Sequence, residues 1–361
     1  MKVGILTYHW ANNYGAVLQA YALLSKLKEM GHDAYIIDKI RTFSGWRRLY
    51  HSYSYKHYFS WYRFLKFNKE FLAPKTPLCT STKQLIATFP SLHFDAVIVG
   101  SDQVWRESFM GHNYFLDFVS GSCKRISYAA SFGLSEWSLN EAFTSKAKQL
   151  MQQFDKISVR EKTGIEICKK VFDVDAELVL DPTLLWDARF YEEKLLNKGC
   201  RVKEPKVVAY ILGENKDQNV AAKNIAQEEN IGFVDLWSHK SLVQGHYTVE
   251  EWLGYIRDAK YVITNSFHAT VFSILFHKQF VVLNNKSGGS DRISTLLNYL
   301  GLQYLFVSTT NKDIYKALGA QIDYQHVDRL LANLRDGSLS FLKNISLLSR
   351  LEIIGPEKAR I

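Results

Sequence analysis

Apolar and polar positions alternate along the chain in a pattern that predicts repeated strand–helix units. Lys2–Tyr8 is a short apolar run typical of a buried strand, and Ala16–Met30 carries apolar residues at helical spacing, with Gly31 placed to end the helix. Ala34–Asp38 then predicts the next strand. A strand–helix–strand order of this kind indicates a parallel sheet, because parallel strands need a long crossover connection.

The same pattern continues through the first half of the chain. Strands are predicted at Phe94–Gly100, Ile126–Ala130, Lys156–Val159 and Glu177–Leu180, and a helix at Glu141–Gln153. Polar and charged residues over Asn197–Pro205 then interrupt the pattern. We therefore expect one domain at residues 1–198 and a second at residues 199–361.

The second half repeats the alternation. Its strands are predicted at Val207–Leu212, Gly232–Asp235, Tyr261–Thr264 and Phe280–Leu283, and its helices at Asn219–Glu229, Thr248–Arg257, Phe267–His277 and Asp291–Gly301. A last helix, Gln325–Leu348, is expected to pack back on the first domain. The chain of 361 residues is too long for one typical core. We predict an α/β fold of two Rossmann-like domains that face a central cleft, the GT-B-like arrangement.

The stretch Lys260–Leu283 places His268 in the first turn of a helix, directly after a buried strand and the polar turn Asn265–Ser266. In open α/β sheets ligands bind at this edge of the strands, and helix N-termini attract anions. No Asp or Glu occurs between Asp258 and Asp291. We therefore expect an anion site without acids, in which His268 is the candidate for proton transfer.

Two polar loops in the first domain are candidates for contact with a hydroxyl-rich ligand. Trp10–Gly15 follows the first strand and contains Asn13 and Tyr14, but it lacks the glycine motifs of dinucleotide and P-loop sites. A helix cap is the alternative interpretation of this loop. Ser101 and Asp102 follow another strand at the same edge, where they could contact sugar hydroxyls.

Two arginines are expected near this edge. Arg160 ends a predicted strand and Arg292 begins a predicted helix, and a guanidinium at either position can clamp a carboxylate or phosphate with two hydrogen bonds. The alternatives are an ion pair between Arg160 and Glu161, and a surface position for Arg292. Asp181, which precedes a proline, is interpreted as a structural anchor.

The net charge of +9 is concentrated in the window Lys39–Lys69, which holds eight Lys or Arg, no acid and many Trp, Tyr and Phe residues. Two interpretations stay open. One is an interfacial segment whose cations meet anionic lipid and whose rings lie among headgroups. The other is an amphipathic helical insert whose rings face the core. No nucleic-acid-binding motif accompanies this window, so nucleic acid is not an expected partner.

Composition and motifs argue against several other classes of protein. With 47% hydrophobic and 22% charged residues, the chain is typical of a globular protein. It has no CxxC pair and no HExxH motif, so neither a zinc site nor another metal is expected. It has no 18-residue apolar run and begins with a strand instead of a signal sequence, which predicts a cytoplasmic protein that does not span a membrane.

Several segments of the chain resemble segments of the polysaccharide pyruvyl transferase family. The matching segments are GILTYHWANNYGAVLQAYAL, FDAVIVGSDQVW, ISYAASFG, ISVREKTG, LVLDPTLLW, ITNSFHATVFSILF and SDRISTLLNYLGL, which lie between residues 3 and 302. The resemblance implies a two-domain GT-B-like enzyme that transfers the enolpyruvyl unit of phosphoenolpyruvate onto two sugar hydroxyls. The products would be a cyclic pyruvate ketal and phosphate. Phosphoenolpyruvate would be a co-substrate, and no cofactor is expected.

The resemblance also assigns roles to residues. His268 would act as general acid or would carry protons between a hydroxyl and the methylene carbon. The donor would be held in the second domain, and the acceptor would lie against the first. Donor-binding candidates are Arg160, Lys286, Arg292 and Ser266, and acceptor-side candidates are Asn13, Tyr14, Ser101 and Asp102. Many family members carry arginine where this chain has Ser266, so we expect Lys286 to replace that arginine.

The acceptor implied by the resemblance is a sugar of a capsular or exopolysaccharide repeat unit, carried as a lipid-linked oligosaccharide. This would place the protein at the inner face of the cytoplasmic membrane, with the Lys39–Lys69 window against anionic lipid. Two alternative functions stay open. One is a GT-B glycosyltransferase with a nucleotide-sugar donor, although the window around His268 lacks the glutamate such enzymes usually use. The other is a non-catalytic saccharide-binding module.

Overall fold

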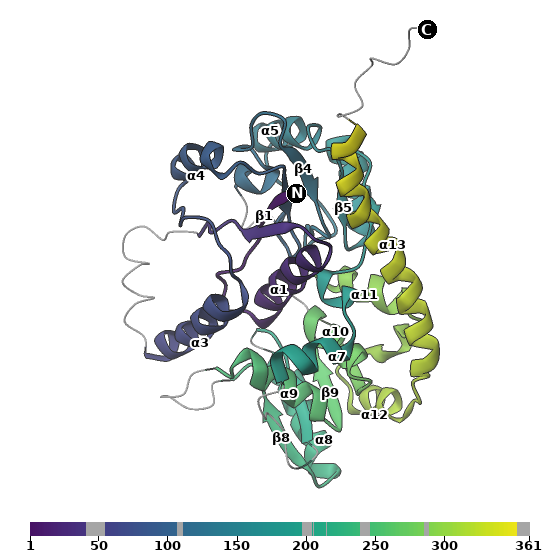
Figure 1. Ribbon diagram of the computed structural model, residues 1–361. Helices are drawn as coiled ribbons and strands as arrows, with labels where there is room; N and C mark the ends of the chain where they lie inside the picture. Colours follow the sequence, from purple (N-terminus) through teal and green to yellow (C-terminus); the bar gives the residue numbers. More distant parts are fainter. Residues whose placement is uncertain are drawn as a thin grey trace.

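The structure is a computed structural model that describes residues 1–40, 55–106, 111–196, 204, 206–213, 215–238, 246–284 and 289–351. It contains two parallel sheets, one from each half of the chain, flanked by helices (Figure 1). The predicted boundary at Asn197–Pro205 lies almost wholly outside the described residues.

The first sheet has four parallel strands in the order β2-β1-β3-β4. They are β1 (Lys2–Leu6), β2 (Asp33–Ile36), β3 (Ala96–Val99) and β4 (Lys124–Ser127). The short pair β5 (Ser158–Val159) and β6 (Glu177–Leu178) extends this sheet through isolated bridges, such as that between Ile126 and Lys156. The central strands β1 and β3 consist of apolar runs, because both faces of a parallel sheet are covered.

Helices of the first half connect and cover these strands. They are α1 (Tyr14–Glu29), α3 (Tyr55–Phe71), α4 (Thr82–Thr88), α5 (Glu141–Met151), α6 (Lys162–Ile167) and α7 (Ala188–Tyr191), with short 3₁₀ segments η1 (Phe89–Leu92), η2 (His112–Phe115) and η4 (Pro182–Leu185) and π segments η3 (Cys168–Phe172) and η5 (Glu192–Leu196). Asn13 caps α1, since its side chain accepts a hydrogen bond from the backbone N–H of Ala16 at 3.2 Å.

The second sheet has five parallel strands in the order β11-β10-β9-β7-β8. They are β7 (Lys206–Tyr210), β8 (Gly232–Asp235), β9 (Tyr261–Thr264), β10 (Gln279–Leu283) and β11 (Phe306–Val307). Its helices are α8 (Lys216–Glu228), α9 (Val249–Asp258), α10 (Phe267–Leu275), α11 (Ser290–Tyr299) and α12 (Asn311–Gly319), with the 3₁₀ segment η6 (Gln303–Leu305). The sequence pattern did not predict β11 or α12, both of which are short.

The last helix, α13 (Tyr324–Leu351), runs from the second domain along the side of the first (Figure 1). The Ser338 hydroxyl accepts a hydrogen bond from the backbone N–H of Leu180 at 2.9 Å, and the Arg335 Nε donates to the carbonyl of Leu184 at 2.8 Å. Both partners belong to the first half of the chain, so α13 joins the two domains.

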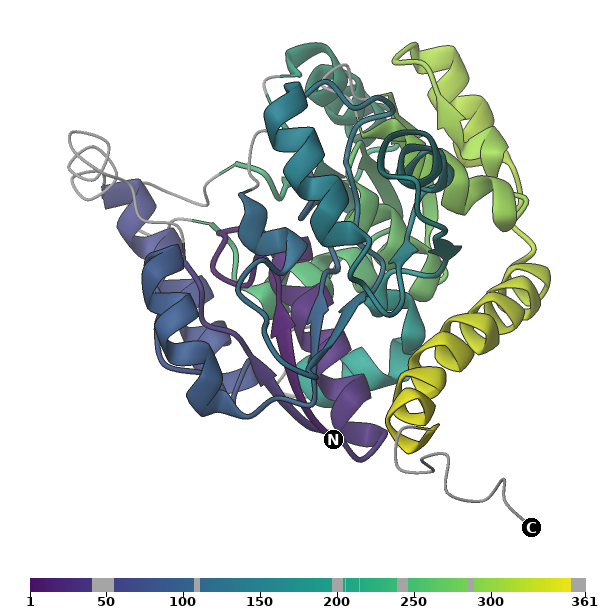
Figure 2. The same cartoon turned by 90° about the horizontal axis from the view of Figure 1, so that it is seen from above.

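Residues 55–69 of the basic window belong to α3, which lies on the side of the molecule opposite α13 (Figure 2). Phe64 and Phe67 are buried and pack against α1 rings, with 5.1 Å between the ring centroids of Phe64 and Tyr14. Arg63 donates to the carbonyl of His246 at 2.5 Å, across the domain boundary. The rings of Phe64 and Phe67 therefore agree with the helical insert that faces the core, whereas the ring of Tyr62 is 55% exposed. Residues 41–54 lie outside the described residues.

Candidate functional site

A cavity of about 580 Å³ lies between the two domains. The first domain contributes Tyr8, Trp10, Ala11, Asn13, Ala16, Lys39, Asp102, Gln103, Gly111, Asn113 and Tyr114 to its wall, and the second contributes Leu212, Ser266, Phe267, His268 and Arg292. This size and this mixture of aromatic and polar groups suit a small-molecule site. The carboxyl ends of β1, β3 and β9 lead into these wall residues, as is typical of doubly wound sheets.

The start of α10 forms the second-domain wall. Strand β9 ends at Thr264, and the N-cap residue Ser266 makes no capping hydrogen bond with its side chain. Ser266, Phe267 and His268 all line the cavity. The helix therefore points its N-terminal N–H groups and the positive end of its dipole toward this side of the cavity, which favours an anionic ligand.

His268 is 7% exposed and packs directly on α1. A β-carbon at Gly15 would lie 2.0 Å from Nδ1 of His268, a distance that no side chain tolerates. Only glycine fits at position 15 while the imidazole stays in place. The contact joins the first turns of two helices from different domains, so domain packing determines the position of the ring.

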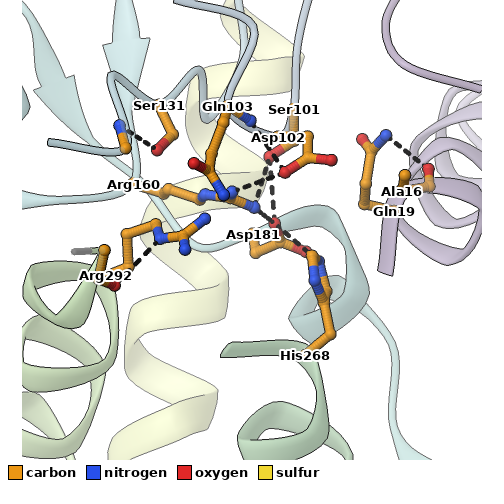
Figure 3. A network of polar contacts seen from close by, with 12 residues as sticks. Ala16, Gln19, Ser101, Asp102, Gln103, Ser131, Arg160, Asp181, His268 and Arg292 are labelled. Atoms are coloured by element: carbon orange, nitrogen blue, oxygen red, sulfur yellow. Dashed lines mark hydrogen bonds and ion pairs between the residues drawn. The ribbon is translucent and has the colours of Figure 1, made fainter. Parts of the chain in front are cut away.

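Asp181 lies on the other side of the imidazole. Its Oδ2 is 3.7 Å from Nε2 of His268, and it accepts a hydrogen bond from the Ser101 hydroxyl at 3.1 Å (Figure 3). Its Oδ1 accepts from the backbone N–H of Thr183 at 3.0 Å and from the Thr183 hydroxyl at 2.6 Å. The carboxylate is 1% exposed and held from several sides, so it provides a fixed charge beside the histidine.

Arg160 is 4% exposed and binds two carboxylates, with Nη1 donating to Asp181 and Nη2 donating to Asp102 at 3.0 Å. Burial acts to raise the pKa of Asp181, but His268 and Arg160 outweigh it and the net shift is downward. The pKa of Asp102 is likewise lowered, because Arg160 and His268 outweigh the effect of burial. Both acids are therefore held in the charged form.

The loop after β3 carries Asp102 to the cavity in a left-handed conformation, with φ of 72°. Just before it, Gly100 has φ of 110°, and a β-carbon there would lie 2.4 Å from the carbonyl oxygen of Tyr128. Non-glycine residues rarely adopt a positive φ, and those that do cluster at functional sites. The tight turn is what brings Asp102 to Arg160 and to the edge of the cavity.

Arg292, in the first turn of α11, reaches the cavity from the second domain. Its guanidinium lies 5.7 Å from the Phe267 ring centroid, and its Nε donates to the Gly289 carbonyl at 3.4 Å. Burial and the neighbouring Arg160 lower the pKa of Arg292 to about 10, which still leaves it charged at neutral pH. A cation beside another cation is stabilised when an anion binds between or near them.

The structure brings six of the nine predicted site residues to or near this cavity wall. Asn13, Asp102, Ser266, His268 and Arg292 line it, and Arg160 lies directly behind Asp102. Asn13 also caps α1, so both interpretations of that residue hold. Lys286 lies outside the described residues.

Three expectations about individual residues are corrected by their surroundings. Tyr14 is 4% exposed, stacks on Trp252 and donates to the carbonyl of Tyr247 at 2.8 Å, so it packs between the domains and does not line the cavity. Ser101 is fully buried, and its hydroxyl forms hydrogen bonds with the carbonyl of Ala129 and with Asp181. Both Nη atoms of Arg160 donate to carboxylates, so Arg160 holds Asp181 and Asp102 in place and does not itself line the cavity.

The expectation that the corner around His268 contains no acid is also wrong. No acid is near in sequence, but Asp181 of the first domain lies 3.7 Å from the imidazole. The sequence analysis interpreted Asp181 as an anchor, which describes its contacts with Ser101 and Thr183. It could not predict the contact between Asp181 and His268, because that contact forms only when the two domains pack together.

The first-domain wall contains residues that the sequence analysis did not assign to the site. Tyr8, Trp10, Lys39 and Tyr114 line the cavity. Lys39 was counted only as one charge of the basic window. Its position, directly after a strand of a parallel sheet, was the signal that places it at this edge.

Within the described residues, no group of three or more His, Cys, Asp or Glu side chains is arranged to hold a metal ion. The described helices include none with the length and hydropathy needed to cross a bilayer.

Comparison with known proteins identifies relatives in sequence and in fold. The family model described as polysaccharide pyruvyl transferase matches residues 13–287 of the chain. A search of curated proteins gave no match. UDP-GlcNAc 2-epimerase from Methanocaldococcus jannaschii has a similar structure, with a TM-score of 0.58 at 10% identity over 90% of this chain and 93% of that one.

UDP-GlcNAc 2-epimerase from Neisseria meningitidis, solved with UDP-GlcNAc bound, has a TM-score of 0.53 at 11% identity over 96% of this chain and 99% of that one. At such identities the similarity concerns the fold alone. It confirms the predicted α/β fold with two Rossmann-like halves in the GT-B-like arrangement.

Proposed function

Since this chain belongs to the polysaccharide pyruvyl transferase family, we propose that it transfers the enolpyruvyl unit of phosphoenolpyruvate onto two hydroxyls of one sugar. The products are a cyclic pyruvate ketal and inorganic phosphate. The observation that supports this proposal most directly is the position of His268, which lines an inter-domain cavity between Asp181 and Gly15. A fixed imidazole beside a buried carboxylate is suited to move protons at a reacting centre.

The donor side of the cavity has the charge that phosphoenolpyruvate requires. Arg292 and the uncapped start of α10 face it, and the single acid in the described wall, Asp102, is already paired with Arg160. A guanidinium forms two hydrogen bonds with a carboxylate or phosphate, and helix N–H groups bind further oxygens. The donor therefore meets positive charge without a competing free carboxylate in the described wall.

The reaction divides into two steps. In the first, one sugar hydroxyl attacks C2 of the enolpyruvyl group, the hydroxyl loses its proton, and the methylene carbon gains a proton to become a methyl group. In the second, the other hydroxyl attacks the same carbon, phosphate leaves with the C–O bond electrons, and the hydroxyl proton ends on phosphate. In this proposal His268 donates the first proton and accepts one from an attacking hydroxyl.

Asp181 has a supporting part in this scheme. The imidazole gains positive charge whenever it takes a proton from the acceptor, and the carboxylate 3.7 Å away stabilises that charge. Arg160 holds the carboxylate in place without facing the cavity itself. The acceptor, which we propose is a lipid-linked oligosaccharide of a capsular or exopolysaccharide repeat unit, would enter against the first-domain wall. A membrane-peripheral location at the inner face of the cytoplasmic membrane follows from that acceptor.

The test is an assay of group release. The protein is incubated with lipid-linked oligosaccharides and either phosphoenolpyruvate or a nucleotide sugar, and phosphate and nucleotide are measured separately. Phosphate release that requires both phosphoenolpyruvate and acceptor is the expected result. Release of nucleotide from a nucleotide sugar would instead identify a glycosyltransferase, which the GT-B-like fold would also accommodate. Binding of saccharide without release of either group would identify a binding module.

A further inference from the structure

The first-domain wall of the cavity contains a cluster of three aromatic rings. The Tyr8 ring centroid lies 6.1 Å from that of Trp10 and 4.9 Å from that of Tyr114, and in both pairs the rings meet edge to face. All three residues line the cavity; Tyr8 and Trp10 come from the loop after β1, and Tyr114 belongs to η2. A pyranose presents an apolar face of C–H groups, and aromatic rings at a pocket wall offer it rigid apolar area.

The indole of Trp10 has a further property. Its Nε1 atom is buried and has no hydrogen-bond partner among the described residues. An indole N–H can only donate, and leaving such a donor buried without an acceptor is unfavourable. A hydroxyl or ring oxygen of a bound sugar would supply the acceptor.

Lys39 adds a positive charge to the same wall. It follows β2, lines the cavity and is half-buried, and its ammonium donates to the carbonyl of Ile40 at 3.1 Å. The neighbouring acid Asp38 is already bound to His9, with 2.8 Å between Oδ1 and Nε2. Burial lowers the pKa of Lys39. An ammonium has three donors and is costly to bury without an anion.

We propose that this wall, comprising Tyr8, Trp10, Tyr114 and Lys39, binds an acceptor sugar that carries an anionic group, with its ring on the aromatic cluster and its anion on Lys39. The inference rests on the proposed function, since it names the chemical class of the acceptor. His268 and Arg292, from the second domain, line the same cavity, so a sugar held here shares the cavity with the proposed proton-transfer group.

Two sources could supply the anion. It is either the carboxylate of a uronic acid in the repeat unit or the diphosphate that joins the sugar to its lipid carrier. The shared chemistry is an anionic oxygen paired with an ammonium. Binding measured by calorimetry separates the sources with two pairs of probes. The first pair is cellobiouronic acid and cellobiose, and the second is farnesyl diphosphoryl glucose and farnesyl glucoside.

The expected result is that the wild-type protein binds the anionic member of one pair about 10-fold or more tightly than the neutral member. Lys39→Gln removes this preference and Lys39→Arg retains it. Lys83→Gln, which removes an exposed lysine of the same domain, leaves it unchanged. Trp10→Phe keeps a ring but loses the N–H, so it weakens the binding of the anionic and the neutral member of the pair alike.

The inference is overturned if neither pair shows a preference for its anionic member, or if the preference survives in Lys39→Gln. These titrations contain no phosphoenolpyruvate, so they are independent of turnover. A preference that depends on Lys39, in a protein that releases no phosphate from phosphoenolpyruvate, would support the sugar site and refute the proposed reaction. Turnover without such a preference would do the reverse.

Discussion

Gly15 and His268 are in direct contact across the domain boundary, because the missing side chain at position 15 leaves the space that the imidazole occupies. A β-carbon there would lie 2.0 Å from Nδ1 and 2.5 Å from Cγ of the ring. The other side of the imidazole faces Asp181 at 3.7 Å. The proton-transfer group of the proposed reaction is therefore held between a glycine and a carboxylate that both belong to the first domain.

Gly15→Ala is expected to displace the imidazole and lower kcat by about 100-fold, because a shift of about 1 Å in a catalytic group costs that much. The measurement is phosphate release at saturating phosphoenolpyruvate and acceptor. Gly337→Ala is the matched control, since Gly337 is an exposed position of α13 where a β-carbon meets nothing within 4 Å. Equal kcat in the two variants would show that position 15 does not constrain His268.

His268→Ala and His268→Gln are each expected to lower kcat by about 10²- to 10⁴-fold, the usual contribution of general acid–base catalysis. The KM for phosphoenolpyruvate should change much less, because Arg292 and the helix N–H groups remain. Circular dichroism and the melting temperature establish that the variants are folded. Turnover near the wild-type rate in either folded variant would remove His268 from the mechanism.

Arg292 and Arg160 should differ in what their substitution affects. Arg292→Ala removes a cation from the cavity wall, and we expect the KM for phosphoenolpyruvate to rise by about 10- to 100-fold with little loss of stability. Arg160→Ala leaves Asp102 and Asp181 buried without their cation, and we expect the free energy of unfolding to fall by about 3–5 kcal/mol. Urea unfolding and donor kinetics on both variants check the contrast. The reverse pattern would assign donor binding to Arg160.

Asp181→Asn should destabilise the protein by about 3 kcal/mol at pH 7, because it leaves the buried Arg160 partly uncompensated. The folded-state pKa of Asp181 is lowered, so the stability that its charge contributes is present above its unfolded pKa of about 3.9 and is lost as pH falls below that value. The difference between wild type and variant should therefore shrink below about pH 4.

Chemical unfolding at pH 7 and pH 3.5 measures this dependence. Glu193→Gln provides a control, since it breaks the exposed ion pair with Arg189 and should cost less than about 1 kcal/mol at either pH. A difference for Asp181→Asn that is as large at pH 3.5 as at pH 7 would argue against a charge effect.

Tyr14→Phe tests whether Tyr14 belongs to the domain interface instead of the substrate site. It removes the hydrogen bond to the carbonyl of Tyr247 and keeps the ring stacked on Trp252, so we expect a loss of about 1 kcal/mol in unfolding free energy. The KM values for donor and acceptor should stay within about 2-fold of wild type. A large rise in either KM would return Tyr14 to the substrate site.

Most of the fold followed from local patterns. The strand Tyr261–Thr264 was predicted with the bounds that the structure has, because buried parallel strands are apolar runs ended by polar or turn residues. The bounds of Gly232–Asp235, a half-buried strand at the sheet edge, were also predicted. The short elements β11 and α12 were missed, since two strand residues and a nine-residue helix carry little periodic signal.

The candidate site was only partly predictable, for a physical reason. Residues that follow strands of a parallel sheet must meet at one edge, so Asp102, Ser266 and His268 could be placed together from the sequence. Whether a side chain there faces a ligand or another side chain depends on its tertiary neighbours. Arg160 and Ser101 lie at the expected edge, but both donate hydrogen bonds to Asp181.

The sequence alone determined that the chain forms two parallel α/β halves and that His268 begins a helix at a ligand-binding edge. It also determined the resemblance that led to the proposed reaction. Only the tertiary structure decided what surrounds the histidine. Gly15 and Asp181 lie far from it along the chain, and they reach it because domain packing brings α1 and the end of β6 to the start of α10. The charge and the free space around a side chain depend on every residue near it in the folded protein, including residues distant in sequence. A local sequence pattern does not contain that information.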